Sequence, residues 1–303
     1  MPISLPPLSR RNFLRGTLAA GAGLFLNRSG FGADGESDPH RFFLLSDIHI
    51  AADKTKAEKG TVMFDNMKQV CGELLAEKNK AAAVIINGDC AYHTGEAEDY
   101  ANFLELLKPV RESGYPIHMS MGNHDRRDNF WKAVPDQDAA RKAVDGRQIT
   151  VLETPRANWI ILDSLDKTNQ TPGVLGEKQL EWLKAALDAR TSKPAIVMVH
   201  HNPVFEEKPK VTGITDTRDF LDILLPRKQV KLLLYGHTHD WTVAKHDGLH
   251  CVNLPAVAYV FKAGKANGWV DFHLGEKGAD LQLHCIDPKH EQHLQNVNLV
   301  WRS

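Results

Sequence analysis

Apolar runs of strand length alternate with amphipathic stretches of helical length between residues 40 and 240. The apolar runs occupy residues 41–45, 81–86, 116–121, 159–163, 195–199 and 230–235. Their nearly continuous apolar character predicts strands that are mostly buried on both faces. The amphipathic stretches, which predict helices with one apolar face, occupy residues 62–78, 96–112, 176–190 and 217–226. This order of elements predicts an α/β protein.

The pattern changes after residue 240, where short segments alternate apolar and polar residues. These segments, with glycine in several of the turns between them, occupy residues 241–246, 250–255, 268–274 and 281–286. A period of two predicts antiparallel strands that complete a mixed or second sheet. Because we find no internal repeat, low-complexity tract or long linker, we expect one domain over residues 34–303, built as a layered α/β sandwich.

Five of the apolar runs end in side chains that commonly bind metals. In chain order these are Asp47 and His49, then Asp89, then Asn123, His124 and Asp125, then His200 and His201, and finally His237 and His239. In open α/β sheets, ligands bind at the carboxyl ends of the strands. We therefore expect these residues, which are far apart in the sequence, to meet at one edge of the fold.

The residue types at these strand ends favour a site for divalent metal ions. A single Asp-x-His or His-x-His pair is usually a surface feature or a capped turn, but chance is a poor explanation of five such groups at equivalent positions. Imidazoles, carboxylates and a carboxamide together are the ligands of borderline and hard divalent metals. Gly88, Gly122 and Gly236 stand beside three of the groups, and we expect them to let the backbone turn sharply into the site.

The ordered set of Asp-x-His, Gly-Asp, Gly-Asn-His-Asp, His and Gly-His-x-His motifs resembles the calcineurin-like metallophosphoesterase superfamily. The resemblance covers residues 41–240. It implies an αββα sandwich of two mixed β-sheets flanked by helices, and it implies hydrolysis of small-molecule phosphate mono- or diesters. A metallo-β-lactamase-type hydrolase is excluded, because the sequence contains no His-x-His-x-Asp-His run.

The resemblance also implies two metal ions, with iron, manganese or zinc as the expected metals. One ion is held by Asp47, His49 and His239, the other by Asn123, His200 and His237, and Asp89 bridges the two. The net charge of two divalent ions, two aspartates and a bridging hydroxide is about +1. This positive charge attracts an anionic phosphate.

The implied reaction is in-line attack of the bridging hydroxide on phosphorus. His124 resembles the acid that protonates the leaving group, and Asp125 is expected to orient the His124 ring. His201 is expected to lie behind the metal ligands or to face the substrate. A catalytically silent metal-binding or adaptor protein on the same fold is the alternative function. The complete ligand set and the presence of His124 favour the enzyme.

Tyr92, three residues after Asp89, departs from the acidic or amide residue that is common there in phosphodiesterase-type members. Its spacing resembles the site of purple acid phosphatases, in which a tyrosinate binds ferric iron. Tyr92 is therefore either a ligand of Fe(III) at one of the two sites or a packing side chain in the loop. The sequence leaves both interpretations open.

Substrate specificity is expected to depend on the segments between the motifs, chiefly residues 126–146 and 202–214. Arg126 and Arg127 are candidates to hold a phosphate, and Trp131 is a candidate to stack on a ring of the substrate. The alternative for the arginines is a solvated surface position.

The first 33 residues predict an export signal. They contain Arg10, Arg11, Arg15 and Arg28 but no acidic residue, and the segment SRRNFL is followed by a short, weakly apolar run. This pattern resembles a twin-arginine signal, so we expect the export machinery of that pathway as a partner and a periplasmic or otherwise exported protein. No stable membrane span is expected after processing. The remaining 33 basic and 38 acidic residues give no general attraction to nucleic acid.

The four cysteines, Cys71, Cys90, Cys251 and Cys285, have no Cys-x-x-Cys spacing. A zinc ribbon or a thioredoxin motif is therefore unsupported. Buried free thiols are the expected state, and disulfide pairing in an exported protein is the alternative.

Overall fold

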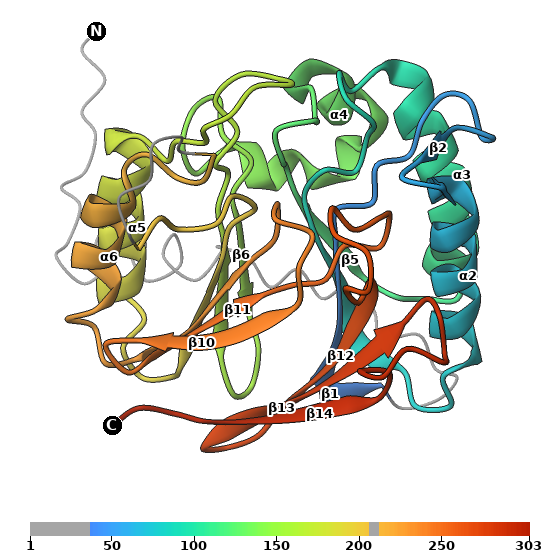
Figure 1. Ribbon diagram of the computed structural model, residues 1–303. Helices are drawn as coiled ribbons and strands as arrows, with labels where there is room; N and C mark the ends of the chain where they lie inside the picture. The colour runs from blue at the N-terminus through green and yellow to red at the C-terminus, as the bar shows by residue number, and fades with distance from the viewer. Residues whose placement is uncertain (1–36, 206–211) are drawn as a thin grey trace, which may run out of the picture. The chain divides into compact units, whose positions relative to one another are not determined.

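The computed structural model describes residues 37–205 and 212–303 (Figure 1). The signal sequence predicted over residues 1–33 lies outside these described residues, as do residues 206–211 of the second segment predicted to set specificity. The described part contains two six-stranded β-sheets and a short hairpin of β2 (Ala57–Glu58) and β3 (Thr61–Val62).

The first sheet has β1 near its middle, with parallel strands on one side and antiparallel strands on the other. Its order is β14 (Gln295–Val300), β13 (Gly278–Cys285), β12 (Gly268–Leu274), β1 (Asp38–Ser46), β4 (Ala81–Asn87) and β5 (Ile117–Ser120). The predicted antiparallel strands near residues 268–274 and 281–286 are confirmed as β12 and β13, which pair with β1 and with each other.

The second sheet has a parallel centre and antiparallel edges. Its order is β10 (Thr242–His246), β11 (Leu249–Asn253), β9 (Val230–Tyr235), β8 (Ala195–Met198), β7 (Asn158–Ile161) and β6 (Thr150–Glu153). The predicted antiparallel strands near residues 241–246 and 250–255 are β10 and β11, which pair antiparallel with each other, and β11 also runs parallel to β9, which makes this sheet mixed. The reason is topological: the β10–β11 hairpin folds back, so that β11 enters between β10 and β9.

The two sheets pack face to face, and helices cover their outer faces (Figure 1). Phe42 and Leu44 of β1 belong to the core between the sheets, while Phe43 and Leu45 belong to the core under the helices. This alternation follows from the period of two along a strand and explains why residues 42–45 of β1 are apolar without interruption. The helices are α2 (Met63–Ala76) and α3 (Ala97–Glu112) beside the first sheet, α5 (Glu177–Asp188) and α6 (Thr217–Leu224) beside the second, and the shorter α4 (Arg127–Ala133) and 3₁₀ helix η1 (Pro135–Arg141). The predicted αββα sandwich is confirmed.

Strand register brings the predicted ligands to one edge of both sheets. Ser46 at the end of β1 pairs with Asn87 of β4, and Asn87 pairs with Ser120 of β5. The Asn87 side-chain amide donates to the carbonyl of Val199, just beyond β8, at 3.2 Å. The ends of strands from both sheets therefore converge at this edge, as expected for a ligand site in an α/β fold.

All four cysteines are free and buried, which confirms the expected thiol state. Among the residues that the structure describes, no helix has the length and apolar character needed to cross a membrane.

A buried ion pair connects β1 to β12 at the opposite end of the first sheet. The Arg41 guanidinium donates two hydrogen bonds to Asp271, from Nε at 2.9 Å and from the terminal nitrogen at 2.6 Å. Both residues are buried. Burial alone would raise the pKa of Asp271, but hydrogen bonds from His273 and Arg41 outweigh it and lower that pKa. The pair therefore stabilises the fold while Asp271 is ionised.

We expect Asp271→Asn to lower the free energy of unfolding at pH 7 by about 2 kcal/mol, because the change removes the charged hydrogen-bond acceptor on one side of a buried guanidinium and leaves it only Glu77, at 2.7 Å, as a charge partner. Since the folded-state pKa is depressed, this contribution is present above about pH 4 and is lost as the pH falls through the lower folded value. Guanidinium chloride unfolding of wild type and variant at several pH values measures both effects. Lys54→Ala, which removes an exposed ion pair with Glu105, is the control and should change stability by about 0.5 kcal/mol or less. A pH-independent difference would contradict the role of ionised Asp271.

Candidate metal centre

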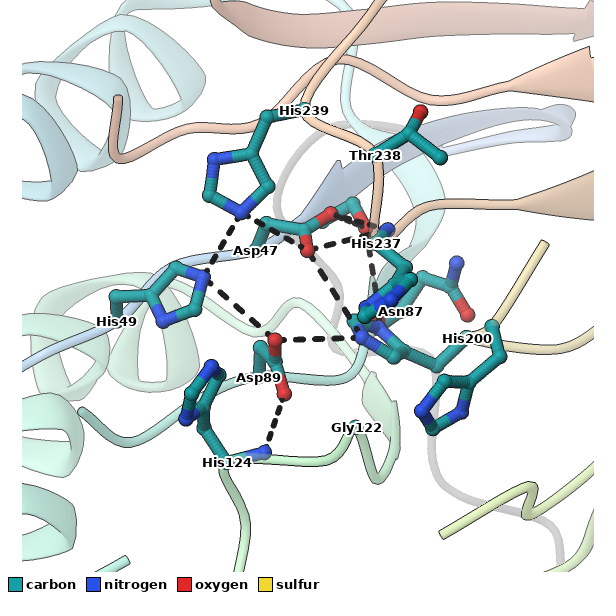
Figure 2. Close-up of polar contacts among 12 residues, drawn as sticks. Asp47, His49, Asn87, Asp89, Gly122, His124, His200, His237, Thr238 and His239 are labelled. Carbon is teal, nitrogen blue, oxygen red and sulfur yellow. Dashed lines mark hydrogen bonds and ion pairs between the residues drawn. The ribbon is translucent and has the colours of Figure 1, made fainter. Parts of the chain in front are cut away.

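One group of ligand-type side chains is formed by Asp47, His49 and His239 (Figure 2). The Nε2 atoms of His49 and His239 lie 3.1 Å apart, and His239 Nε2 lies 3.4 Å from an Asp47 carboxylate oxygen. His239 Nδ1 donates to the Tyr259 carbonyl at 2.6 Å. Because a carbonyl only accepts, Nδ1 carries the proton and the Nε2 lone pair faces the group. Metal-binding histidines are commonly held in this way.

A second group is formed by Asp89, His200 and His237. His200 Nε2 lies 3.3 Å from Asp89, and His200 Nδ1 donates to the Asn87 carbonyl at 2.8 Å. Asn123 Oδ1 is buried and accepts no hydrogen bond from the described residues. A buried acceptor in this state is costly unless something else binds it. The donor set and this oxygen both fit a metal ion.

Asp89 lies between the two groups. The same carboxylate oxygen is 3.6 Å from His49 Nε2 and 3.3 Å from His200 Nε2. The other oxygen accepts the backbone N–H of His124 at 2.8 Å. One carboxylate is thus within reach of imidazoles on both sides (Figure 2), which is the geometry that a bridging ligand requires.

The backbone of the candidate ligand residues is in a sparsely populated conformation. A positive φ between 47° and 70° occurs at Asp47, His49, Asp89, His237 and His239. Such conformations are uncommon outside glycine and persist where the surrounding structure enforces them. Here the N–H groups of Ile48 and His49 donate to the Asp89 carbonyl at 2.9 and 2.8 Å, so two motifs fix each other's turns.

The motif glycines meet two different requirements. Gly88 has a φ of +73° and provides the sharp turn that the sequence predicted. At Gly122 and Gly236 the requirement is space: a Cβ atom would lie 2.1 Å from a carboxylate oxygen of Asp89 at the first position and 2.6 Å from one of Asp47 at the second. The prediction of a turning role is therefore corrected for these two glycines, which let backbone approach the carboxylates.

The electrostatics of the centre favour cations. Burial opposes ionisation of Asp47, but the charges of His239 and His200 outweigh it and lower the pKa of Asp47. The pKa of Asp89 is also lowered against the effect of burial, chiefly by His200. Burial lowers the pKa of His49 to about 3, which leaves a neutral imidazole. The pKa of His200 instead rises to about 10, because Asp89 and Asp47 outweigh its burial. An ion that binds His200 must therefore displace a proton.

His124 lies beside this centre, with its ring centroid 5.2 Å from that of His49. Its Nδ1 donates to the His93 carbonyl at 2.9 Å, which leaves Nε2 as the atom that can transfer a proton. The prediction that Asp125 orients this ring is corrected. Asp125 is fully buried. Its carboxylate accepts hydrogen bonds from the N–H groups of Gly122, Cys90 and Ala91 and from the Tyr100 hydroxyl.

Tyr92 directs its hydroxyl to a different acceptor. The hydroxyl donates to Glu58 at 3.1 Å, and the ring stacks on His93 with centroids 3.9 Å apart. Burial, followed by Glu58, raises the pKa of Tyr92 to about 12, which disfavours a tyrosinate. This geometry matches the packing alternative; binding of a metal would require the hydroxyl to leave Glu58.

The side chains proposed for substrate binding have structural contacts. Arg127 is mostly buried and is paired with buried Asp163 at 3.0 Å, so its guanidinium already holds a carboxylate in place of a phosphate. The Trp131 indole donates to Gln148 at 3.0 Å. His201 is buried with its Nδ1 2.7 Å from the Ser164 hydroxyl, a position behind the ligands. Arg126 stays near the surface, 3.6 Å from Glu96.

Sequence reasoning missed His93, whose main-chain carbonyl holds the His124 ring. It likewise missed the carbonyls of Tyr259 and Asn87, which hold His239 and His200. No side-chain signal marks such residues, because every residue type carries the same carbonyl.

Comparison with known proteins gives consistent matches. The calcineurin-like phosphoesterase family matches residues 40–241, and the twin-arginine translocation signal matches residues 7–26. The cyclic AMP phosphodiesterase CpdA of Pseudomonas aeruginosa is 25% identical over 231 residues, which are 75% of this chain and 79% of that protein. A probable cyclic nucleotide phosphodiesterase of Synechococcus is 27% identical over 80% of this chain and 91% of its own length. A dimetal phosphatase from Danio rerio superposes with a TM-score of 0.67 at 13% identity, covering 88% of this chain and all of that one, which shows a shared fold.

We expect the purified protein to retain two metal ions per chain and Asp89→Asn to retain one or none, because the carboxylate that faces both groups loses its charge. Metal analysis after dialysis against metal-free buffer measures this.

Tyr92→Phe should keep both ions, since Glu58 holds the hydroxyl; loss of one ion from this variant would support the ligand role instead. His246→Ala, a histidine outside both groups, is the control. Retention of two ions by Asp89→Asn would contradict the bridging assignment.

Proposed function

The chain belongs to the calcineurin-like phosphoesterase family and is an exported, metal-dependent phosphate ester hydrolase; from this premise we propose that its substrates are phosphodiesters, with cyclic nucleotides as the substrate class. The observation that carries the reaction at this centre is the position of Asp89, which faces both imidazole groups and also fixes the backbone of His124. This position supports a dinuclear centre with a proton donor beside it.

We propose that Asp47, His49 and His239 hold one ion, that Asn123, His200 and His237 hold the other, and that Asp89 bridges them. Two ions bound there would activate a water molecule and stabilise negative charge on the phosphoryl oxygens. Iron, manganese and zinc all suit this donor set. Ferric iron at the first site would additionally require Tyr92 to change its partner.

His124 is proposed to give a proton to the leaving oxygen from Nε2. The His93 carbonyl fixes the proton on Nδ1, so only a protonated ring has a second proton to donate. Asp89 holds the His124 backbone at 2.8 Å, which keeps the acid close to the metal groups. A general acid of this kind matters most where the leaving group is a poor one.

The charge of the site supports a diester over a monoester. A phosphodiester carries one negative charge, whereas a monoester carries close to two at neutral pH. Of the two arginines that were candidates to hold this second charge, Arg127 is paired with Asp163 and also donates to the Leu165 carbonyl, and Arg126 lies near the surface beside Glu96. The named activities of the Pseudomonas and Synechococcus relatives support the same substrate class.

The alternative of a silent metal-binding or adaptor protein is less well supported. A site that no longer catalyses has no need to keep its proton donor, yet His124 is held beside His49 by two specific hydrogen bonds. The complete set of ligands and acid supports turnover.

We expect protein loaded with manganese to convert cyclic AMP to a nucleoside monophosphate and to hydrolyse bis(p-nitrophenyl) phosphate at least about tenfold more efficiently than p-nitrophenyl phosphate. Asp89→Asn should lower kcat/KM by about 10³-fold because a charged group shared by both ions is lost. Colorimetric and chromatographic assays measure these rates. A preference for the monoester would contradict the diesterase proposal, and hydrolysis of neither ester with any of the three metals would contradict turnover itself.

We expect His124→Ala to lower kcat about 10²-fold for cyclic AMP, whose leaving group is a ribose alkoxide, and less than about tenfold for bis(p-nitrophenyl) phosphate, whose leaving group needs little protonation. Metal content measured on the same samples shows that both ions are kept, and His246→Ala is the matched histidine control. An equal loss on both substrates would contradict the role of His124 as the acid.

A further inference from the structure

We propose that Phe261 is a substrate-binding residue on which the base of a nucleotide substrate stacks. The inference rests on the proposed function of the centre and extends it, since it names a part of the chain that recognises the organic group of the ester.

Phe261 is an exposed aromatic side chain in direct contact with a proposed metal ligand. Its ring stacks on the ring of His239, with centroids 4.3 Å apart and an interplanar angle of 27°. More than half of the residue's surface, 56%, is exposed. One face of the ring is therefore occupied by His239, and most of the remainder is open to solvent. Beside a polar centre, an exposed aromatic ring offers apolar surface that a stacked base would remove from water.

The loop that carries Phe261 is fixed to the metal centre by its backbone. The N–H groups of Val257 and Ala258 donate to the carbonyls of Ser46 and Asp47 at 2.9 and 3.1 Å. The Tyr259 carbonyl accepts the Nδ1 proton of His239. Phe261 follows two residues later, so its distance from the centre is set by the same contacts that position the ligands.

The Asn66 side chain of α2 fixes the loop from its other side. Its amide donates to the carbonyls of Val257 at 3.0 Å and Ala258 at 2.6 Å. The Tyr259 ring lies 4.7 Å from His239 and 5.3 Å from His49. Aromatic rings thus line the side of the centre formed by Asp47, His49 and His239, and Phe261 is the exposed end of that lining.

Trp131, the aromatic residue that the sequence suggested for stacking, is less available. Its indole N–H donates to Gln148, and the Arg141 guanidinium lies over its ring at 5.2 Å. Phe261, by contrast, has ring contacts with His239 and Tyr259 and is still 56% exposed. Stacking of a base on an aromatic ring tolerates any base, because every base has a π-face. The chemistry therefore fits nucleotides as a class.

The experiment compares cyclic AMP with its abasic counterpart, ribose 3′,5′-cyclic phosphate. The two esters share the phosphate and the leaving group and differ only in the base. In wild type, kcat/KM is expected to be about tenfold higher for cyclic AMP, through a lower KM. Phe261→Ala should reduce this ratio to about one, and Phe261→Trp should keep it within about twofold of wild type. Leu75→Ala, an exposed apolar residue at the far end of α2 from Met63, is the control.

The outcomes separate this inference from the proposed function. If wild type hydrolyses both esters and Phe261→Ala lowers both rates equally, Phe261 only packs on His239 and the stacking role is overturned. A wild type that shows no preference for the base overturns it as well. If wild type hydrolyses neither ester, the proposed function fails and the inference falls with it. Metal analysis of Phe261→Ala is expected to find both ions. That result excludes an indirect effect of the substitution through His239.

Discussion

The burial of two ionised carboxylates in one cluster is the constraint on which the rest of the site depends. Asp47 and Asp89 are buried, and their pKa values are lowered in spite of burial. Such charges are costly unless cations and hydrogen-bond donors surround them. Asp47 accepts from the Ser46 hydroxyl at 2.5 Å and the His237 N–H at 3.1 Å. The surrounding imidazoles and the close glycine backbone both meet this requirement.

Three histidines of the centre are oriented by the same device. In His200, His239 and His124 the Nδ1 atom donates to a main-chain carbonyl, at 2.8, 2.6 and 2.9 Å respectively. The arrangement fixes the tautomer and leaves Nε2 for a metal or a proton. Because a carbonyl belongs to the backbone, the rigidity of the sheets and of the loop after β11 is passed directly to the reactive atoms.

The polar edge is stable because the rest of the sandwich is strongly apolar. β1 contributes to two cores at once, and its Phe42 ring packs against Trp159 of the other sheet with centroids 4.8 Å apart. This packing supports the positive φ angles of five candidate ligand residues, each of which costs free energy. Metal binding to the folded state alone would further stabilise the protein by mass action. The apolar cores thus supply the stability that offsets the unfavourable backbone conformations at the strand ends.

The sequence by itself determined the layered α/β architecture, four main helices and the residues that meet at the site. Apolar periodicity and side-chain chemistry both follow directly from the identity of each residue. Only the tertiary structure decided the parallel insertion of β11, the pairing of Arg127 with Asp163, the hydrogen bond of Tyr92 to Glu58 and the attachment of Asp125 to the loop. It also revealed the carbonyl of His93 and the exposed ring of Phe261. These features depend on which groups become neighbours after long-range packing, and backbone carbonyls look the same in every residue, so no local pattern encodes them.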